Sequence, residues 1–586
     1  MMKKTLFSII VMLLTLQFTY AQRQVTGTVR GGDNNEPLIG ASVLVSGTKV
    51  GTITDANGKF LVPVPENASS LQVSYIGYEK QSVSVKGLTN VQVTLALGKE
   101  LSEVVVVGYT SQRKEDLTGS VVVVDMKPIK NNSTGNPMQS LQGRVPGLYI
   151  EKDGSPNGSN SRILIRGANT LGNNDPLYVI DGIPTTRPEV FQNLNPANIE
   201  SVQVLKDASA ESIYGARASN GVIIVTTKNG GNTNGKIEFQ FNSSVSAQSE
   251  KSMRFNMLNA VDRGKALWQA SVNDGQDPAA GYGDIYSFNW NNDFKNPVLS
   301  GVTVKPYVGG DQNTPAGDTN WQDVMFKTGI VTKNDFTASY GNKNSSLEIN
   351  LGQLKNTGML RFTDYERLSG SINALTRAYN DKLKFGVNLR VANSNETLTA
   401  RDLGGASTTF LAVTLAPTIP VFQKDGITYA GASGGGYSDR NNPLHMQDIA
   451  KWNNANRLST FGNVFLEIQP IENLFFKSNL GADNATYFNR VITPKFSEGA
   501  FNRTTNSLSF DQNHYISTNW SNTLRYNWDL NAKNQFKFLL GTELIRTDFD
   551  FQFIKKEGFA LQTDDYFTLN AGTGNTKVSG GSTGHR

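Results

Sequence analysis

The sequence predicts a mainly β protein with a small β-sandwich, an α+β domain and long antiparallel strands typical of a barrel. Charged residues make up only 18% of the chain while glycine reaches 56 residues, which favours a β-rich, turn-rich protein over a helical one. Short β-branched runs alternate with Gly-, Asn- and Pro-rich turns as far as residue 231, and longer strands of alternating polarity follow. The chain of 586 residues is also too long for one compact core, which predicts several domains.

The first 21 residues predict export from the cytoplasm. Lys3 and Lys4 precede an apolar run over residues 6–16, and Ala21 offers a small residue where a leader peptidase cuts. The apolar run is shorter than the roughly 20 residues of a membrane-spanning helix. We therefore expect residues 1–21 to be a cleaved signal peptide rather than an anchor.

Composition and spacing argue against several kinds of site. The absence of cysteine removes disulfides, thiolate metal ligands and cysteine nucleophiles, and the net charge of +5 is dispersed, without the clustering that nucleic-acid binding needs. His445, His514 and His585 lie far apart without metal-ligand spacing. The Gly-x-Ser-x-Gly pattern at 431–435 lies in a Gly/Ser-rich loop, not between the strand and helix of a hydrolase, and no pair of acidic residues stands out. We expect no enzyme activity, no catalytic residue, no metal site and no cofactor.

Residues 22–98 predict a small antiparallel β-sandwich. Alternating runs recur at short spacing, at residues 25–29, 41–45, 71–75 and 91–95. Asn57 and Gly58 between two such runs predict a tight hairpin turn. Asp55 and Asn57 could also begin a calcium loop, but the later acidic ligands are missing, which favours the turn.

Residues 99–115 form a polar linker that contains a run of valines, Val104–Val107, directly after Glu103. An exposed apolar strand invites unwanted pairing, so its presence in a linker needs a reason. It is either a strand that pairs with a partner by β-augmentation or the first strand of the following domain.

Residues 116–231 predict an α+β domain. Candidate strands lie at residues 121–124, 163–166, 177–180, 202–205 and 222–227, and a helical interval at 207–214 is closed by Gly215. Arg166 and Asp181 stand beside apolar strands. We expect each of them either to make a buried contact or to lie at a solvated strand end.

Residues 235–586 predict longer strands with one apolar and one polar face. Apolar side chains alternate with polar ones over residues 383–390 and 524–530. Apolar outward and polar inward faces are what a transmembrane β-barrel requires, although a soluble sandwich alternates too. The long polar stretches at 264–300 and 397–456 favour a barrel with long loops on one side.

Several motifs in a fixed order resemble the plug domain of TonB-dependent outer-membrane transporters of the SusC/RagA branch. They are Ile165-Arg166-Gly167, the PLYVIDG string at 176–182, VLKDA at 204–208, Tyr214-Gly215 and NGVIIVTTK at 220–228. The resemblance implies a plug motif made of Arg166, Gly167, Asp181, Gly182, Lys206, Asp207, Tyr214, Gly215, Asn220 and Gly221. Residues 22–98 resemble the carboxypeptidase regulatory-like extension that precedes the plug in many SusC-like proteins.

The resemblance implies active import of a large nutrient, a glycan or a peptide, across the outer membrane of a Gram-negative bacterium. It makes the linker a Ton box, in which Glu103, Val104, Val105, Val106 and Val107 contact TonB, energised by ExbB and ExbD. It also implies a SusD-like surface lipoprotein and outer-membrane lipid as partners. The alternative is a secreted β-sandwich binding protein or adhesin without transport.

The length predicts an incomplete barrel. A plugged barrel of this type needs about 22 strands, and the roughly 350 residues after Gly235 suffice for about half of them. We therefore expect a truncated sequence whose residues 235–586 form an incomplete antiparallel transmembrane β-barrel, seen as an open, curved sheet.

Overall fold

The structure is a computed structural model of the chain. It describes residues 23–32, 35–48, 50–65, 68–75, 78–96, 104–107, 110–113, 121–124, 135–151, 155–156, 158, 161–207, 212–231, 233–250, 254–400, 405–437, 440–531 and 534–585. The expected signal peptide and Glu103 lie outside these residues.

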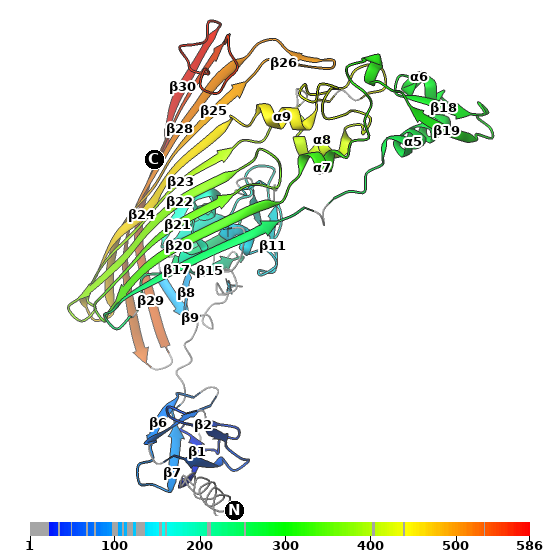
Figure 1. Ribbon diagram of the computed structural model, residues 1–586. Helices are drawn as coiled ribbons and strands as arrows, with labels where there is room; N and C mark the ends of the chain where they lie inside the picture. The colour runs from blue at the N-terminus through cyan, green and yellow to red at the C-terminus, as the bar shows by residue number, and fades with distance from the viewer. Residues whose placement is uncertain are drawn as a thin grey trace, which may run out of the picture. The chain divides into compact units, whose positions relative to one another are not determined.

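The N-terminal part forms a β-sandwich of two sheets (Figure 1). In sheet order, the first has β4 (Lys59–Val64), β1 (Arg23–Gly31) and β7 (Asn90–Leu95), and the second has β3 (Gly51–Ile53), β2 (Ser42–Val45), β5 (Ser70–Ser74) and β6 (Gln81–Ser84). Alternate residues, among them Val25, Val43 and Val62, fill a shared apolar core. The expected sandwich is present, but the expectation of purely antiparallel sheets is wrong because β7 runs parallel to β1. The chain passes through the second sheet between these strands, so it returns without a hairpin.

The valine run is a strand. β8 (Val104–Val107) and β9 (Thr110–Arg113) form a two-stranded sheet of their own. The run is therefore not a strand of the sheet that follows it in the sequence.

Residues 121–231, which we call the central domain, are built on a five-stranded sheet. Its order is β10 (Val121–Val124), β15 (Ile199–Leu205), β16 (Val222–Thr227), β13 (Leu177–Ile180) and β14 (Ile183–Thr185). A hairpin of β11 (Leu148–Glu151) and β12 (Arg162–Ile165) and the short helices α2 (Pro137–Ser140), α3 (Pro188–Gln192) and η2 (Pro196–Asn198) complete the domain. β13 and β16 have the expected limits because their continuous apolar runs are buried in the sheet.

The expected helical interval that Gly215 closes is described only in part. The segment is a 3₁₀ helix, η3 (Ser212–Ala218), and residues 208–211 lie outside the described residues. Gly215 is not helical, with φ 65° and ψ −153°, so the first turn ends there as expected and a second short turn follows. Tyr214 and Ala218 on either side of Gly215 are buried in one apolar cluster, so packing holds the second turn in place.

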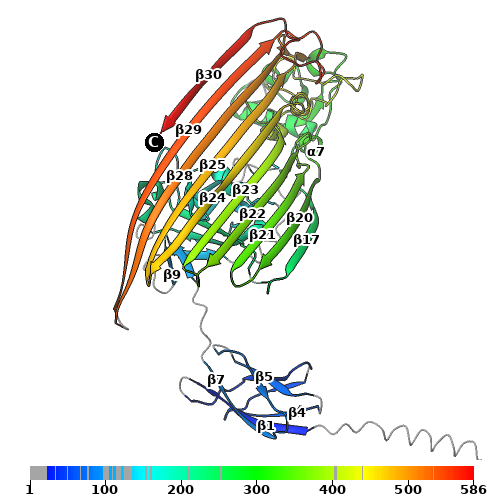
Figure 2. The same cartoon turned by 90° about the vertical axis from the view of Figure 1, so that its left-hand side faces the viewer.

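The C-terminal part forms one open, ten-stranded antiparallel sheet, which we call the large sheet (Figure 2). Its strands in order are β17 (Ile237–Gln248), β20 (Gly329–Gly341), β21 (Ser345–Asn356), β22 (Tyr365–Ala378), β23 (Leu383–Thr397), β24 (Asn454–Ile471), β25 (Leu474–Thr493), β28 (Ser507–Asn531), β29 (Asn534–Glu557) and β30 (Thr576–His585). Short turns join neighbouring strands at one end and long connections join them at the other. The expected open antiparallel sheet is thus confirmed.

The stretches 264–300 and 397–456 lie almost entirely in the long connections at one end of the large sheet, as expected, but these connections contain secondary structure of their own. The first long connection contains α5 (Ala260–Asn273), α6 (Pro278–Tyr282), β18 (Tyr286–Trp290), β19 (Leu299–Val304), η5 (Val308–Gly310) and α7 (Trp321–Met325). Later connections contain α8 (Thr408–Thr414), α9 (Pro443–Ile449), β26 (Phe496–Glu498) and β27 (Phe501–Arg503). Local signals explain α5, since Asn259 caps its N-terminus and Trp268 packs against Trp290. No helix within the described part of the chain is long and apolar enough to cross a membrane.

Candidate functional site: the seam between the central domain and the large sheet

The two faces of the large sheet differ in chemistry. On β23, Arg390 is buried against the central domain, while its neighbours Leu389 and Val391 are exposed on the opposite face. Residues that pair across adjacent strands point to the same face of the sheet. The strand registers therefore show which residues of the other strands lie on the face of Arg390 and which lie on the face of Leu389. Exposed apolar side chains on the face away from the central domain include Phe241, Leu351, Leu368, Phe385, Leu466, Leu480, Leu524 and Leu540. The large sheet is therefore apolar on one face and polar where it meets the central domain.

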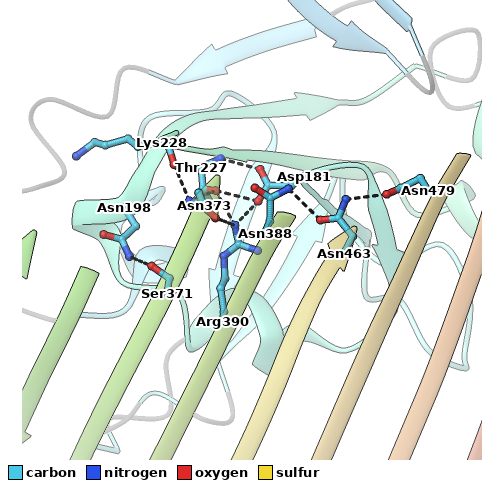
Figure 3. Close-up of polar contacts among 10 residues, drawn as sticks. All are labelled: Asp181, Asn198, Thr227, Lys228, Ser371, Asn373, Asn388, Arg390, Asn463 and Asn479. Atoms are coloured by element: carbon cyan, nitrogen blue, oxygen red, sulfur yellow. Dashed lines mark hydrogen bonds and ion pairs between the residues drawn. The ribbon is translucent and has the colours of Figure 1, made fainter. Parts of the chain in front are cut away.

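Asp181 lies at the centre of the contact between the central domain and the large sheet, which we call the seam (Figure 3). Its Oδ1 accepts the Thr227 N–H at 2.9 Å and its Oδ2 accepts the Thr227 hydroxyl at 2.8 Å. Arg390 pairs with the same Oδ2 and donates to Thr227 Oγ1 at 2.6 Å. Only 9% of the Asp181 side chain and 10% of that of Arg390 are exposed. Removing one partner of such a pair leaves the other charge buried and unpaired.

The two-residue turn between β13 and β14 positions the Asp181 carboxylate toward Thr227 and Arg390. Ile180 pairs with Ile183, and the two loop residues Asp181 and Gly182 take φ values of 49° and 85°. Positive φ at both positions is the type I′ turn that Asp-Gly sequences favour. The Asp-Gly of the plug-like motif thus has a local conformational reason.

Neutral amides continue the seam along the sheet (Figure 3). Asn373 donates to Thr227 Oγ1 at 3.1 Å and to the Lys228 carbonyl at 2.5 Å. Asn198 donates to Ser371 Oγ at 2.8 Å. On the large sheet itself, a relay of amides runs from Asn388 through Asn463 to Asn479, with bonds of 3.0 and 2.7 Å.

A second buried ion pair joins the central domain to β25 of the large sheet. Arg187 pairs with Asp483 of β25 at 2.7 Å and donates to the Tyr487 hydroxyl at 2.6 Å. Its guanidinium also lies over the Tyr515 ring, 4.6 Å from the centroid. Thr185 donates to the second Asp483 oxygen at 3.0 Å, so this carboxylate is bonded on both oxygens.

Further contacts extend the seam from β20 to β29. They are Asn195 with Asp335 (2.5 Å), Arg367 with the Gln192 and Gly135 carbonyls (3.1 and 3.3 Å), and Arg217 with Glu543 (2.6 Å). Phe461 of β24 adds an apolar contact, since it is buried in the core of the central domain. Water can replace polar contacts when two surfaces separate, so most of these bonds have a substitute if the seam opens.

The apolar core of the central domain contains a tyrosine, Tyr178, whose hydroxyl stays neutral. Tyr178 stacks on Phe191 at 5.7 Å and is fully buried. Burial, together with the charges of Asp175 and Glu189, raises the pKa of the Tyr178 hydroxyl far above neutral pH.

The other residues of the plug-like motif make contacts within the central domain. Arg166 pairs with Asp207 at 2.7 Å on the surface, with 55% and 30% of the two side chains exposed. Lys206 donates to the Pro146 carbonyl at 3.0 Å and Asn220 donates to the Asn173 carbonyl at 3.0 Å. For Arg166 and Asp181, the sequence left two alternatives open. Asp181 makes a buried contact, whereas Arg166 lies at a solvated strand end.

The motif glycines shape the backbone. Gly167, Gly182, Gly215 and Gly221 have φ values of 100°, 85°, 65° and 92°, a region that other residues rarely adopt. At Gly221 a Cβ atom would also lie only 2.5 Å from Ile165 Cδ1. Tyr214 is buried in an apolar cluster with Leu177 and Val222 of the neighbouring strands.

Reasoning from the sequence missed Arg187, Thr227, Arg390 and Asp483 as functional residues. A charge at an inward position of an alternating strand could have singled out Arg390 and Asp483. No sequence signal indicated that they meet Asp181 and Arg187, because their partners lie 209 and 296 residues away.

The remaining candidates for chemistry lie in the long connections. The Gly-x-Ser-x-Gly pattern at 431–435 is in the connection between β23 and β24, outside any strand or helix. His445 Nδ1 pairs with the buried Glu498 carboxylate and its ring stacks on Tyr429. In the described ranges, no group of three or more His, Cys, Asp or Glu side chains could hold a metal ion.

Comparison with known proteins agrees with this architecture. Residues 25–107 match the CarboxypepD_reg-like domain, and residues 113–222 match the TonB-dependent receptor plug domain. The chain is 30% identical over 576 residues to the TonB-dependent receptor SusC of Bacteroides thetaiotaomicron, in a match that covers 93% of this chain and 51% of SusC. The chain belongs to the SusC/RagA family of TonB-dependent receptors. Its central domain is the plug of this family.

Two further relatives show the same extent of similarity. The TonB-dependent receptor P39 of Formosa agariphila is 30% identical over 549 residues, which cover 92% of this chain and 48% of P39. The RagAB peptide importer in its open-open state superposes with a TM-score of 0.63 and 26% identity, covering 82% of this chain and 53% of that chain. The chain thus spans about half the length of the relatives it matches.

Proposed function

We propose that this SusC/RagA-family protein takes part in TonB-dependent import of a large nutrient across the outer membrane of a Gram-negative bacterium. The observation that carries the proposal is the large sheet, whose inward face holds the plug through a polar seam and whose outward face is apolar. Such a wall suits a boundary between lipid and a water-filled lumen. The nutrient is a glycan or a peptide, and the structural relative RagAB is described as a peptide importer.

The import mechanism is mechanical rather than catalytic. The β8 valines form the Ton box, pair with a strand of TonB by β-augmentation, and transmit a pull that ExbB and ExbD energise. The pull opens the seam, and water replaces its hydrogen bonds as the plug moves. A SusD-like surface lipoprotein covers the opposite side and retains the nutrient. No step requires an enzyme or a cofactor.

The substitution Val105→Pro tests the Ton box. Proline removes a main-chain donor from β8 and should abolish TonB-dependent uptake while nutrient binding at the cell surface remains. Val105→Thr keeps the donor and a β-branched side chain, so it should retain most uptake. The measurements are growth on the nutrient that requires the protein and binding of labelled nutrient to intact cells. Unchanged uptake in Val105→Pro, and again after deletion of residues 104–107, would instead support a surface-binding protein without transport.

A further inference from the structure

The seam contains two small cavities, each beside an incompletely bonded arginine of the large sheet. The first has a volume of about 30 Å³ and is lined by Arg390, Asn198 and Phe461 among others. The second has a volume of about 20 Å³ and is lined by Arg367, Asn195 and Leu354. Residues of the plug and of the large sheet line both, so both cavities lie in the seam.

Buried polar atoms at these cavities lack partners. Arg390 Nη1 and Asn198 Oδ1 are buried without a hydrogen-bond partner in the described part of the chain, although both residues are less than a tenth exposed. At the second cavity the same holds for Arg367 Nε, with 5% of the residue exposed. A buried N–H or C=O without a partner costs about 1–3 kcal/mol, more for a charged group, so native proteins rarely leave one unpaired.

A water molecule fits both cavities. A cavity needs about 10–15 Å³ of space open to the centre of a water-sized sphere to hold one water, and the water needs two to four polar partners. The first cavity offers the Arg390 donor and the Asn198 acceptor, with the hydroxyls of Thr227 and Ser371 also on its lining. The second offers the Arg367 donor with Asn195 and Asp335.

We propose that the seam binds ordered water at two sites, at least one molecule between Arg390 and Asn198 and another at Arg367. The water completes the hydrogen bonds that the fixed side chains leave unmade. It also places solvent beside the Asp181–Arg390 pair before the seam opens. When the plug separates from the large sheet, Arg390 is therefore already in contact with water. That last consequence rests on the proposed function, whereas the water sites themselves do not.

Hydroxyl-radical footprinting of the purified protein in detergent tests the proposal, because radicals generated from a bound water label the side chains next to it. Phe461 lines the first cavity, whereas Phe191 belongs to the same apolar cluster without lining it, and both rings are buried. We expect Phe461 to be labelled several-fold faster than Phe191. Equal, slow labelling of the two rings would overturn the first water site, and it would leave TonB-dependent uptake untested by this measurement.

The substitution Ala392→Leu distinguishes a bound water from a transient opening of the seam. Ala392 lines the first cavity, so leucine should fill it and reduce Phe461 labelling to the Phe191 rate. Ala485→Leu, at another buried alanine of the large sheet outside this lining, should leave the Phe461 rate unchanged. Fast labelling that persists in Ala392→Leu would contradict the proposal. If neither variant folds, a high-resolution structure of the unmodified protein decides, through the presence or absence of solvent density within hydrogen-bonding distance of Arg390 Nη1 and Arg367 Nε.

Discussion

At the residue scale, burial separates two ion pairs of the plug that look alike in the sequence. Asp181 and Arg166 both follow short apolar strands, yet Asp181 pairs with a buried arginine of the large sheet and Arg166 with a half-buried aspartate of the plug itself. Exposed ion pairs contribute little, whereas breaking a buried one from one side is strongly destabilising. The Asp181–Arg390 pair is therefore expected to hold the plug to the large sheet far more strongly than the Arg166–Asp207 pair stabilises the plug.

The substitution Arg390→Met should weaken attachment of the plug by about 3–5 kcal/mol, because it leaves the Asp181 carboxylate buried without its cation. Arg166→Met should cost less than about 1 kcal/mol, since its pair is largely exposed. Denaturant titration with proteolysis of the released plug measures both effects. Combining Arg390→Met with Asp181→Asn should recover part of the loss. Equal effects of the two arginine substitutions would contradict this ranking.

The glycines of the motif offer a second test at this scale. Gly182→Ala and Gly221→Ala both place a Cβ in a left-handed conformation, which costs roughly 1–2 kcal/mol. Gly182 faces open space, whereas at Gly221 the new Cβ would meet Ile165 Cδ1. We expect Gly221→Ala to lower the free energy of unfolding by about 1 kcal/mol more than Gly182→Ala, as measured by urea titration. A larger loss at Gly182 would show that the Ile165 contact is not limiting.

Sequence reasoning at this scale identified Asp181 but not its partner. The Asp-Gly turn is local, so its conformation follows from the two residues themselves. The identity of Arg390 depends on how β23 is placed against the plug, which follows from strand pairings far along the chain. The partner of Asp483 likewise depends on how β25 is placed against the plug, so no local sequence pattern identifies it.

At the element scale, β29 changes which face carries its apolar side chains. Leu540 and Leu544 point away from the plug, on the face proposed to meet lipid. Farther along the strand, Phe549 and Phe551 share the face of Glu543, which contacts the plug through Arg217. Asp548 and Asp550 then occupy the outward face. We infer that β29 leaves the lipid near Arg546 and continues into water.

The pair Leu540→Arg and Gln552→Arg tests this boundary, because both residues lie on the outward face of β29. An outward arginine costs about 2–4 kcal/mol near the bilayer midplane and about 0–1 kcal/mol near the interface. We expect Leu540→Arg to lower folding stability in lipid vesicles and Gln552→Arg to leave it nearly unchanged. Equal losses would place Gln552 within the lipid layer. Losses in detergent micelles should follow the same order with smaller size.

Elements that carry their own pattern were predictable, and elements set by packing were not. The apolar runs of β13 and β16 sit where their sequence indicates. The parallel pairing of β1 with β7 has no local signal, because it depends on the path of the chain between two sheets. The second short turn after Gly215 likewise depends on burial of Tyr214 and Ala218.

At the scale of the large sheet and its connections, the long connections between strands pack against one another. Trp321 of the first long connection donates to the Ala416 carbonyl at 3.2 Å and shares an apolar cluster with Leu415. From a third connection, Glu498 accepts the Asn442 N–H at 2.6 Å and pairs with His445. These contacts join segments about 50 to 100 residues apart, which is why the polar composition of each segment alone predicted only loops.

The proposed import cycle requires the plug to move relative to the large sheet, and a crosslink across the seam should stop it. The chain has no native cysteine, so cysteines introduced at Arg217 and Glu543, whose side chains lie 2.6 Å apart, are the only thiols. A short bis-maleimide with a reducible linker should abolish uptake but not nutrient binding, and reduction should restore uptake. A matched pair at Ser517 and Thr547, both on the large sheet and 3.0 Å apart, cannot hold the plug and should leave uptake unchanged. Uptake that continues at the normal rate with the seam crosslinked would mean that the nutrient passes without displacement of the plug from β29.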